Sequence, residues 1–242
     1  MRRTHIAGIL LVLVISTGFT AHSIMPGPHT VTLRFTHGVG DRVLTLSGET
    51  YVDPYGEPFT VEKFRYYVSH LRITGDDNTG QVISEDPHLV DEADSSTKAI
   101  TFSTFIIRIK SIQFLLGVDS IENVSGAQAG DLDPLKGMFW TWNSGYVFAK
   151  LEGKSDSSHA NAHFLSWHVG GFRQYQNALR TVRLVLKDTP SPGDTITVHA
   201  DILKWFNALH PIRIAESPVC HDPGPLSMQI ADNYASMFSI ER

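Results

Sequence analysis

Cysteine is nearly absent from this chain of 242 residues, which has Cys220 alone. No disulfide can form within the chain, so its stability must come from an ordinary hydrophobic core. Basic residues are also scarce, since 25 acidic residues outnumber 20 Lys and Arg and give a net charge of -5. Without a basic surface the protein is not expected to bind nucleic acid.

The short motifs of common enzyme classes are missing as well. The chain contains neither Gly-x-Ser-x-Gly nor His-Glu-x-x-His, and Gly38 and Gly40 are not followed by the Lys and hydroxyl residue of a phosphate-binding loop. Cys220 and His221 are neighbours, but adjacent side chains of an extended segment point to opposite sides and do not form a nucleophile and its base. We predict that the protein is not an enzyme.

A long hydrophobic run occurs at the N-terminus, where Arg2 and Arg3 precede an apolar stretch at 6–19 and small residues follow at 21–23. This is the order of a secretory signal peptide, and the stretch is short for a membrane span. We expect a signal peptide at 1–23 and a single mature domain at 24–242. The mature protein is then periplasmic or secreted, with no stable membrane insertion after cleavage.

The rest of the chain is patterned as short strands separated by turns. Residues 31–35 alternate between apolar and polar, and 64–73 are rich in aromatic and β-branched residues. Further strands are expected at 99–109, 111–117, 145–151, 163–169, 181–187 and 195–200. One short helix is expected to begin at Asp201, and another carries Ile230 and Tyr234 at helical spacing. The predicted fold is all-β, a single-domain β-sandwich with one or two short covering helices.

Histidine, in contrast, is plentiful, with 12 residues. Imidazole is the commonest metal ligand in proteins, so this number favours metal binding. His37, His88 and His168 lie at the ends of strand-like runs, and His168 shares a strand face with Phe164 and Ser166. Each of the three is most simply a surface or hydrogen-bonded histidine, and only the fold can bring them together.

Trp140 and Trp142 are two of only four tryptophans in the chain. In an extended segment both indoles lie on one face, together with Met138. An aromatic packing stripe is the simplest interpretation, because an indole buries a large area.

Acidic and amide side chains gather at Asp119, Asn123, Asp131 and Asp133. Such oxygens suit calcium, but their spacing matches no EF-hand loop. Turns and helix caps explain them equally well, and a structural role is expected.

A set of fragments in a shared order resembles the MbnP-like proteins and spans most of the mature chain. The fragments are residues 64–69, 88–91, 117–119, 132–134, 137–142, 144–146, 168–171 and 230–234. The resemblance implies an exported, β-rich copper-binding protein that is paired with a MauG-like dihaem enzyme, which oxidises a tryptophan of its partner to kynurenine.

In this chain the resemblance implies His168 as the first copper ligand, His37 and His88 as the next, and Trp140 or Trp142 as the oxidised residue. Indole N–H can only donate a hydrogen bond, whereas kynurenine offers an amine and a ketone, and imidazoles suit copper. The alternative is a cell-surface β-sandwich module for protein interaction or carbohydrate binding, in which these aromatic residues are structural. Copper binding requires His168 and a second histidine to converge on one of the two tryptophans.

Overall fold

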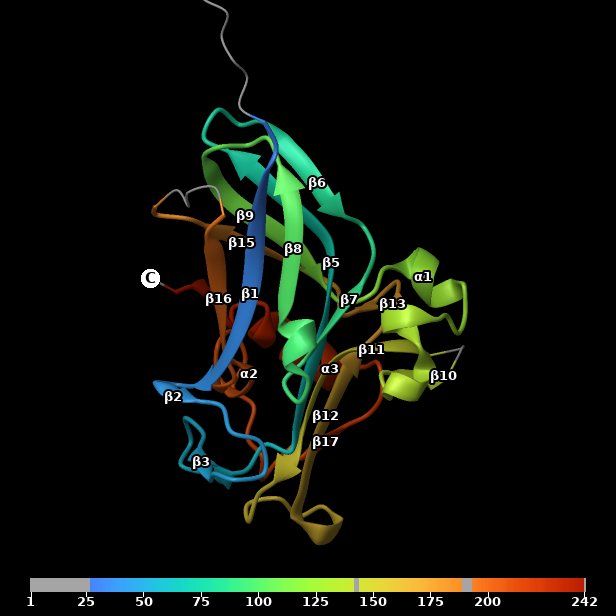
Figure 1. Ribbon diagram of the computed structural model, residues 1–242. Coiled ribbons are helices and arrows are strands. Elements are labelled where there is room, and N and C mark those ends of the chain that lie inside the picture. Colours follow the sequence, from blue (N-terminus) through green and yellow to red (C-terminus); the bar gives the residue numbers. More distant parts are fainter. Residues whose placement is uncertain (1–26, 142–143, 189–192, 242) are drawn as a thin grey trace, which may run out of the picture.

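The computed structural model describes residues 27–141, 144–188 and 193–241. The segment predicted to be a signal peptide and Trp142 lie outside these residues. Within them two β-sheets pack face to face around an apolar core, and short helices lie at the sides (Figure 1). The prediction of an all-β sandwich with short helices is confirmed.

The smaller sheet is built around β1 (His29–Val39), in which Val31, Leu33 and Phe35 point into the core. Its strand order is β18-β16-β1-β2, and β8 also pairs with β1. The pairing of β1 with β16 is parallel, and the other pairings are antiparallel. The partner strands are β2 (Arg42–Val43), β8 (Ala99–Thr104), β16 (Thr195–Asp201) and β18 (Phe238–Ile240).

The larger sheet has the order β15-β9-β5-β11-β12-β17. Its long central strand β5 also pairs with β6 and β7, and β10 pairs with β11. The strands are β5 (Lys63–Gly75), β6 (Gly80–Ser84), β7 (His88–Asp91), β9 (Ile109–Leu116), β10 (Phe139–Thr141), β11 (Gly145–Lys154), β12 (Phe164–Gly170), β15 (Arg180–Val185) and β17 (Val219–Cys220). Two small hairpins join β3 (Tyr51–Val52) to β4 (Pro58–Phe59) and β13 (Phe172–Arg173) to β14 (Gln176–Asn177).

The strands expected at 99–109 and 111–117 are present with shifted bounds. β8 ends at Thr104, whose side-chain hydroxyl accepts a hydrogen bond from the Ile106 amide and turns the chain. β9 begins at Ile109 and pairs with β5 in the larger sheet. The sequence pattern does not show that the chain changes sheets between them, because both strands satisfy the same pattern.

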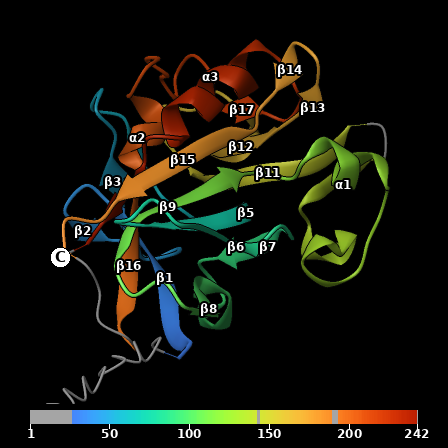
Figure 2. The same cartoon turned by 90° about the horizontal axis from the view of Figure 1, so that it is seen from above.

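Three α-helices are present in the described residues (Figure 2). α2 (Leu203–Phe206) and α3 (Pro225–Tyr234) contact each other, and α3 lies beside β12. The helix expected to begin at Asp201 begins at Leu203, because Asp201 is the last residue of β16 and Ile202 is the N-cap. The Asp201 carboxylate accepts a hydrogen bond from the Leu203 amide. α1 (Ser120–Val124), next to β11, was not expected, because five residues are too few for a helical repeat.

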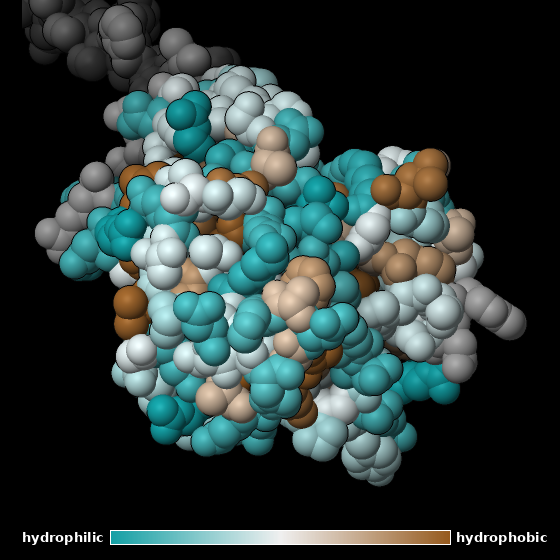
Figure 3. All heavy atoms as spheres, turned by 90° about the horizontal axis from the view of Figure 1, so that it is seen from below, coloured by the Kyte–Doolittle hydropathy of each residue, from teal (hydrophilic) through white to brown (hydrophobic). Residues whose placement is uncertain are grey.

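Single 3₁₀ turns complete the connections at η1 (Ser95–Lys98), η2 (Gly130–Leu132), η3 (Pro134–Lys136) and η4 (Asn161–His163). Within the described part of the chain, no helix combines the length and apolar character needed to cross a membrane. The end of the molecule shown in Figure 3 is mostly hydrophilic, with apolar residues in small separate groups.

At Gly153, β11 approaches the backbone of Thr60 closely, and a substitution of this glycine tests that packing. A Cβ atom at Gly153 would lie 1.8 Å from the Thr60 carbonyl oxygen, so Gly153→Ala must displace backbone. We expect a loss of about 3 kcal/mol in the free energy of unfolding, at the upper end of overpacking costs. Urea denaturation measures it.

The matched control is Gly80→Ala in β6, where an added Cβ meets no atom within 4 Å. We expect its free energy of unfolding to stay within about 0.5 kcal/mol of the parent protein. Equal stabilities of the two variants would contradict the described packing of β11.

Candidate metal site

The outer face of β12 carries the strongest candidate site. Leu165, Trp167 and Val169 are buried in the core, so Ser166 and His168 point to the opposite face. β17 pairs with β12 in parallel, with Trp167 opposite Cys220. The next residue, His221, therefore lies beside His168 on the outer face.

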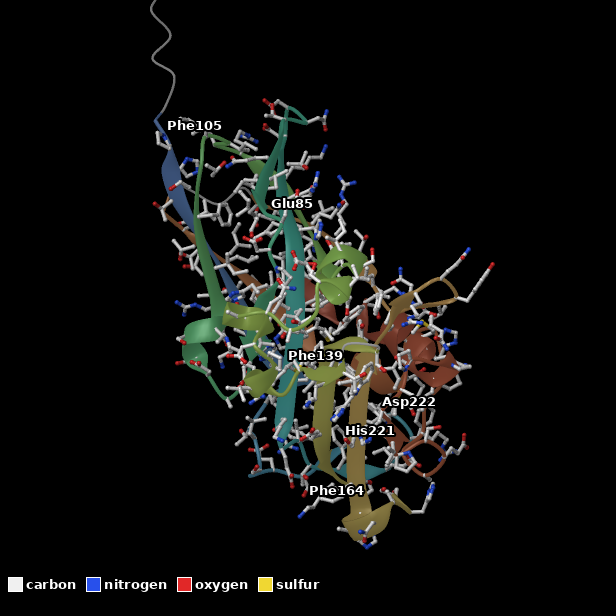
Figure 4. All side chains as sticks on the ribbon, turned by 90° about the vertical axis from the view of Figure 1, so that its right-hand side faces the viewer. Glu85, Phe105, Phe139, Phe164, His221 and Asp222 are labelled. Atoms are coloured by element: carbon white, nitrogen blue, oxygen red, sulfur yellow. The ribbon has the colours of Figure 1, made fainter. Side chains whose placement is uncertain are left out.

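The two imidazole rings stack on each other. Their centroids are 4.4 Å apart and their planes are inclined by 27°. The Ser166 hydroxyl oxygen is 2.7 Å from Nε2 of His221 and 3.4 Å from Nε2 of His168. In Figure 4 His221 lies between Phe139 of β10 and Phe164 at the far end of β12.

Glu152 of β11 fixes the protonation of His168. Its Oε1 atom lies 2.7 Å from Nε2 of His168, and its Oε2 atom lies 2.7 Å from Nζ of Lys63. The hydrogen bond from His168 holds the pKa of Glu152 well below its usual range. A carboxylate only accepts, so Nε2 of His168 carries a proton, and Nδ1 is the nitrogen of this ring that faces no carboxylate. Metal-binding histidines characteristically donate their other N–H to a carboxylate in this way.

The surroundings of His221 favour its neutral form. Partial burial lowers its pKa, and any positive charge on the neighbouring His168 lowers it further. Across the described residues, no hydrogen bond reaches Nδ1 of either His168 or His221. A neutral imidazole with a free nitrogen is the form that binds metals.

A cavity of about 430 Å³ opens beside the pair. Its lining includes Glu152, Ser166, His168 and His221, together with the apolar residues Phe164 and Val219. The imidazole pair is therefore accessible from solvent on one side while the sheet supports it from the other.

Trp140 of β10 packs next to this face. Its nearest ring carbon would lie 3.0 Å from a Cβ atom added at Gly170, which is two residues after His168 on the same side of β12. The indole Nε1 atom is buried and has no hydrogen-bond partner among the described residues. An unpaired buried N–H is unusual and costs stability. Because Trp142 lies outside the described residues, the expectation that both indoles share a face is left untested.

His37 lies elsewhere, at the end of β1. Its side chain is fully buried, Nδ1 is 2.5 Å from Oε2 of Glu92, and Nε2 is 2.9 Å from the Tyr66 hydroxyl. Burial lowers the pKa of His37 against the opposing effect of the Glu92 hydrogen bond. The neutral ring therefore donates to Glu92 and accepts from Tyr66, which leaves neither nitrogen free.

His88, in β7, is also fully hydrogen-bonded. Its Nε2 atom is 2.7 Å from the Thr97 carbonyl oxygen, and its Nδ1 atom is 3.1 Å from Oδ2 of Asp131. Both partners are acceptors, so both ring nitrogens carry protons. Burial acts to lower the pKa of His88, but the hydrogen bonds to Asp131 and Thr97 outweigh it and raise the pKa. An imidazolium has no lone pair for a metal.

The structure thus does not bring together the three histidines singled out in the sequence. It pairs His168 with His221, which carries no metal signal in the sequence, because β12 and β17 are distant in sequence and pair only in the fold. Glu152 was missed for the same reason. Among residues 27–141, 144–188 and 193–241, no group of three or more His, Cys, Asp or Glu side chains has a geometry that holds a metal ion.

The acidic and amide residues considered for calcium have structural roles. The Asp119 carboxylate caps α1 through the Glu122 amide, and the Asp133 carboxylate caps η3 through the Leu135 amide. The buried Asn123 side chain donates to the Val118 carbonyl and accepts from the Tyr146 amide.

Comparison with known proteins gives two matches. The family model described as MbnP matches residues 28–222. The solved structure "MbnP from Methylosinus trichosporium" is similar with a TM-score of 0.55 and 16% sequence identity, and the match covers 75% of this chain and 78% of that one. No curated protein matches the sequence. Neither match indicates a catalytic family, in agreement with the prediction of a protein that is not an enzyme.

The ion pair of His88 and Asp131 predicts a pH-dependent stability. The hydrogen bond from His88 lowers the pKa of Asp131, so this contribution is present above the ordinary Asp value of about 4 and is lost as pH falls through the lowered pKa. The pKa of His88 is raised, so its contribution is present below about 6.5 and is lost as pH rises through the raised pKa. The pair stabilises most between these values.

Asp131→Asn should therefore lower the free energy of unfolding by about 2 kcal/mol near pH 5.5, and by less above the raised pKa of His88. Urea denaturation across the pH range measures this difference. Asp77→Asn is the control, because Asp77 bonds within its own turn to Thr79 and faces no histidine. The loss in the free energy of unfolding of Asp131→Asn should shrink as the pH rises through the raised pKa of His88. A loss that stays constant over this pH interval would show that His88 is not held as the imidazolium.

Proposed function

Because this chain belongs to the MbnP family, we propose that it is an exported copper-binding protein whose metal site is built on His168 and His221. The site is completed when a MauG-like dihaem partner enzyme oxidises Trp140 to kynurenine. The observation that supports this proposal most directly is the imidazole pair itself, with Glu152 bonded to the far nitrogen of His168.

The donor set fits copper. Two neutral imidazoles suit Cu(II), which also competes well against other divalent ions for nitrogen sites. The two rings are stacked, so His168 and His221 would hold one copper ion together only after a ring had rotated, and His221 is the exposed member of the pair. Glu152 keeps His168 oriented during that change.

A third donor is needed, because the imidazole pair supplies two ligands and the Glu152 carboxylate at this face is already bonded to His168 and Lys63. Trp140 is suitably placed, since it packs over Gly170 on the same face of β12 as His168. Its ring nitrogen is an N–H that only donates, and it is unpaired and buried. Opening of the indole ring replaces it with an aromatic amine and a ketone, both of which have lone pairs.

Export supports the same proposal. The N-terminal residues 1–23 have the sequence order of a signal peptide, which would place the mature chain in the periplasm or outside the cell. A haem enzyme that modifies Trp140 has to act on the folded protein or its surface there. Trp140 is half-buried in β10, at the edge of the larger sheet, rather than inside the core.

Copper binding is tested by removing one imidazole. His221→Gln and His168→Gln should each weaken Cu(II) binding by at least about 100-fold. This is more than the loss in affinity that follows when a residue that only hydrogen-bonds to a metal ligand is removed. Competition with a copper chelator measures the affinity, and electron paramagnetic resonance reports the bound nitrogens. His210→Gln is the control, because His210 pairs with Asp232 on the surface.

Unchanged copper affinity in both His168→Gln and His221→Gln would refute the site. A protein that binds no copper in any form would instead favour the alternative of an interaction or carbohydrate-binding module.

The oxidation step is tested by co-expression with a MauG-like dihaem enzyme, followed by intact-mass measurement and peptide mapping. We expect kynurenine at Trp140, loss of the modification in Trp140→Phe, and its retention in Trp142→Phe. Modification of Trp142 alone would contradict the assignment to Trp140, and an unmodified protein would contradict the enzyme pairing.

A further inference from the structure

Tyr66 differs from the other buried tyrosines in the partner of its hydroxyl group. It donates to a neutral imidazole, Nε2 of His37, at 2.9 Å. The other buried tyrosines with a described acceptor donate to backbone carbonyls, which are not bases; they are Tyr51, Tyr67, Tyr146 and Tyr234. Tyr66 alone among them is therefore placed to give up its proton to a base.

His37 is in turn placed to accept that proton. Its Nδ1–H donates to Glu92 at 2.5 Å, so a positive charge formed on the ring would face a carboxylate. Burial acts to raise the pKa of Glu92, but the hydrogen bonds from His37 and Lys98 outweigh it and lower the pKa, which keeps Glu92 ionised. A base oriented by a carboxylate is the usual arrangement of a proton acceptor.

We propose that Tyr66 is a redox-active tyrosine, which a one-electron oxidant converts to a neutral phenoxyl radical while its proton moves to His37. This inference does not depend on copper binding or on the modification of Trp140. It requires a one-electron oxidant strong enough to oxidise an indole, a class that includes high-valent haem and photo-oxidised ruthenium(III) complexes.

A row of aromatic rings connects Tyr66 with the strand that carries the imidazole pair. Trp167 of β12 and Trp205 of α2 are parallel, with centroids 6.4 Å apart and planes inclined by 3°. Phe64 contacts Trp205 at 5.9 Å and Tyr66 at 5.6 Å. Trp167 directly precedes His168, so the row extends from beneath the outer face of β12 to the His37 end of β1.

The indoles in this row have no base to receive a proton. Nε1 of Trp167 donates to the Ser217 carbonyl, and Nε1 of Trp205 donates to the sulfur of Met237. An electron hole on either indole therefore stays a radical cation until an electron reaches it. Tyr66 is the member of the row that can release a proton together with that electron.

The oxidant takes one electron from Trp167 or Trp205, and the resulting radical cation takes one electron from Tyr66 across Phe64. The phenolic O–H bond breaks, the proton forms the second N–H of His37, and the phenoxyl radical is left neutral. The tryptophan returns to its original state, and the imidazolium is paired with Glu92.

The cluster has an outlet to solvent. A cavity of about 530 Å³ is lined by His37, Glu92, Lys98, His199 and Glu241. Tyr66 itself is fully buried, so a radical there is shielded from solvent while the proton can leave through Glu92 and this cavity.

The experiment uses flash-generated tris(bipyridine)ruthenium(III), with a cobalt(III) ammine as the sacrificial electron acceptor. The full mature chain carries Tyr175→Phe, because Tyr175 is 90% exposed and would be oxidised directly. We expect a tyrosyl radical in the frozen sample by electron paramagnetic resonance, with a hyperfine pattern that changes when the tyrosines are ring-deuterated. Adding Tyr66→Phe should abolish the signal.

Tyr67→Phe is the matched control, since Tyr67 is the next residue, is equally buried, and donates to the Asp131 carbonyl. It should leave the radical yield unchanged. His37→Gln keeps a polar side chain but removes the base, and should slow radical formation roughly 100-fold, the lower range for a positioned base. Circular dichroism verifies that each variant is folded.

A tyrosyl signal that persists in Tyr66→Phe, or that disappears in Tyr67→Phe, would overturn the proposal. If Tyr66→Phe does not fold, the His37→Gln variant tests the proposal instead. An unchanged rate of radical formation in that variant would show that His37 accepts no proton and would overturn the proposal. None of these readouts involves copper, so the result is independent of the proposed metal site.

Discussion

The alternation of side chains along β12 is the constraint on which the candidate site depends. Trp167 is fully buried and stacks on Trp205, so a shift of one residue in register would expose this indole and bury His168. The burial of one large side chain thus sets the direction of its neighbours. Glu152 on β11 and His221 after β17 reach His168 only because both strands pair with β12.

Hydrogen bonding divides the histidines into different roles. His88 has an acceptor at each ring nitrogen and is held as a cation, which makes it part of the scaffold. His37 has an acceptor on one side and a hydroxyl donor on the other, which makes it a buried neutral base. His168 has an acceptor at Nε2 alone, and no described residue bonds to its Nδ1 atom. The same residue type thus supplies a structural ion, a proposed proton acceptor and a proposed metal ligand.

The fold places two kinds of chemistry on opposite sides of one strand. The outer face of β12 holds the imidazole pair next to Trp140, whereas its inner face begins the aromatic row that leads to Tyr66. The two proposals are related, because the oxidation proposed for Trp140 would need a strong oxidant near β12. In such a protein Trp167, Trp205 and Phe64 would carry an electron hole to Tyr66, whose proton moves to His37.

The sequence by itself determined the all-β class, most strands, both C-terminal helices and the face that His168 shares with Ser166, because these follow from local alternation and helical spacing. The family was indicated differently, by the resemblance of ordered fragments such as 64–69, 137–142 and 168–171, and the family model agrees. Only the tertiary structure decided which histidines meet. His221 and Glu152 reach His168 through strand pairings distant in sequence, and the partners of His37 and His88 come from other strands and loops. Such contacts leave no periodic signal, since they depend on which strands lie side by side.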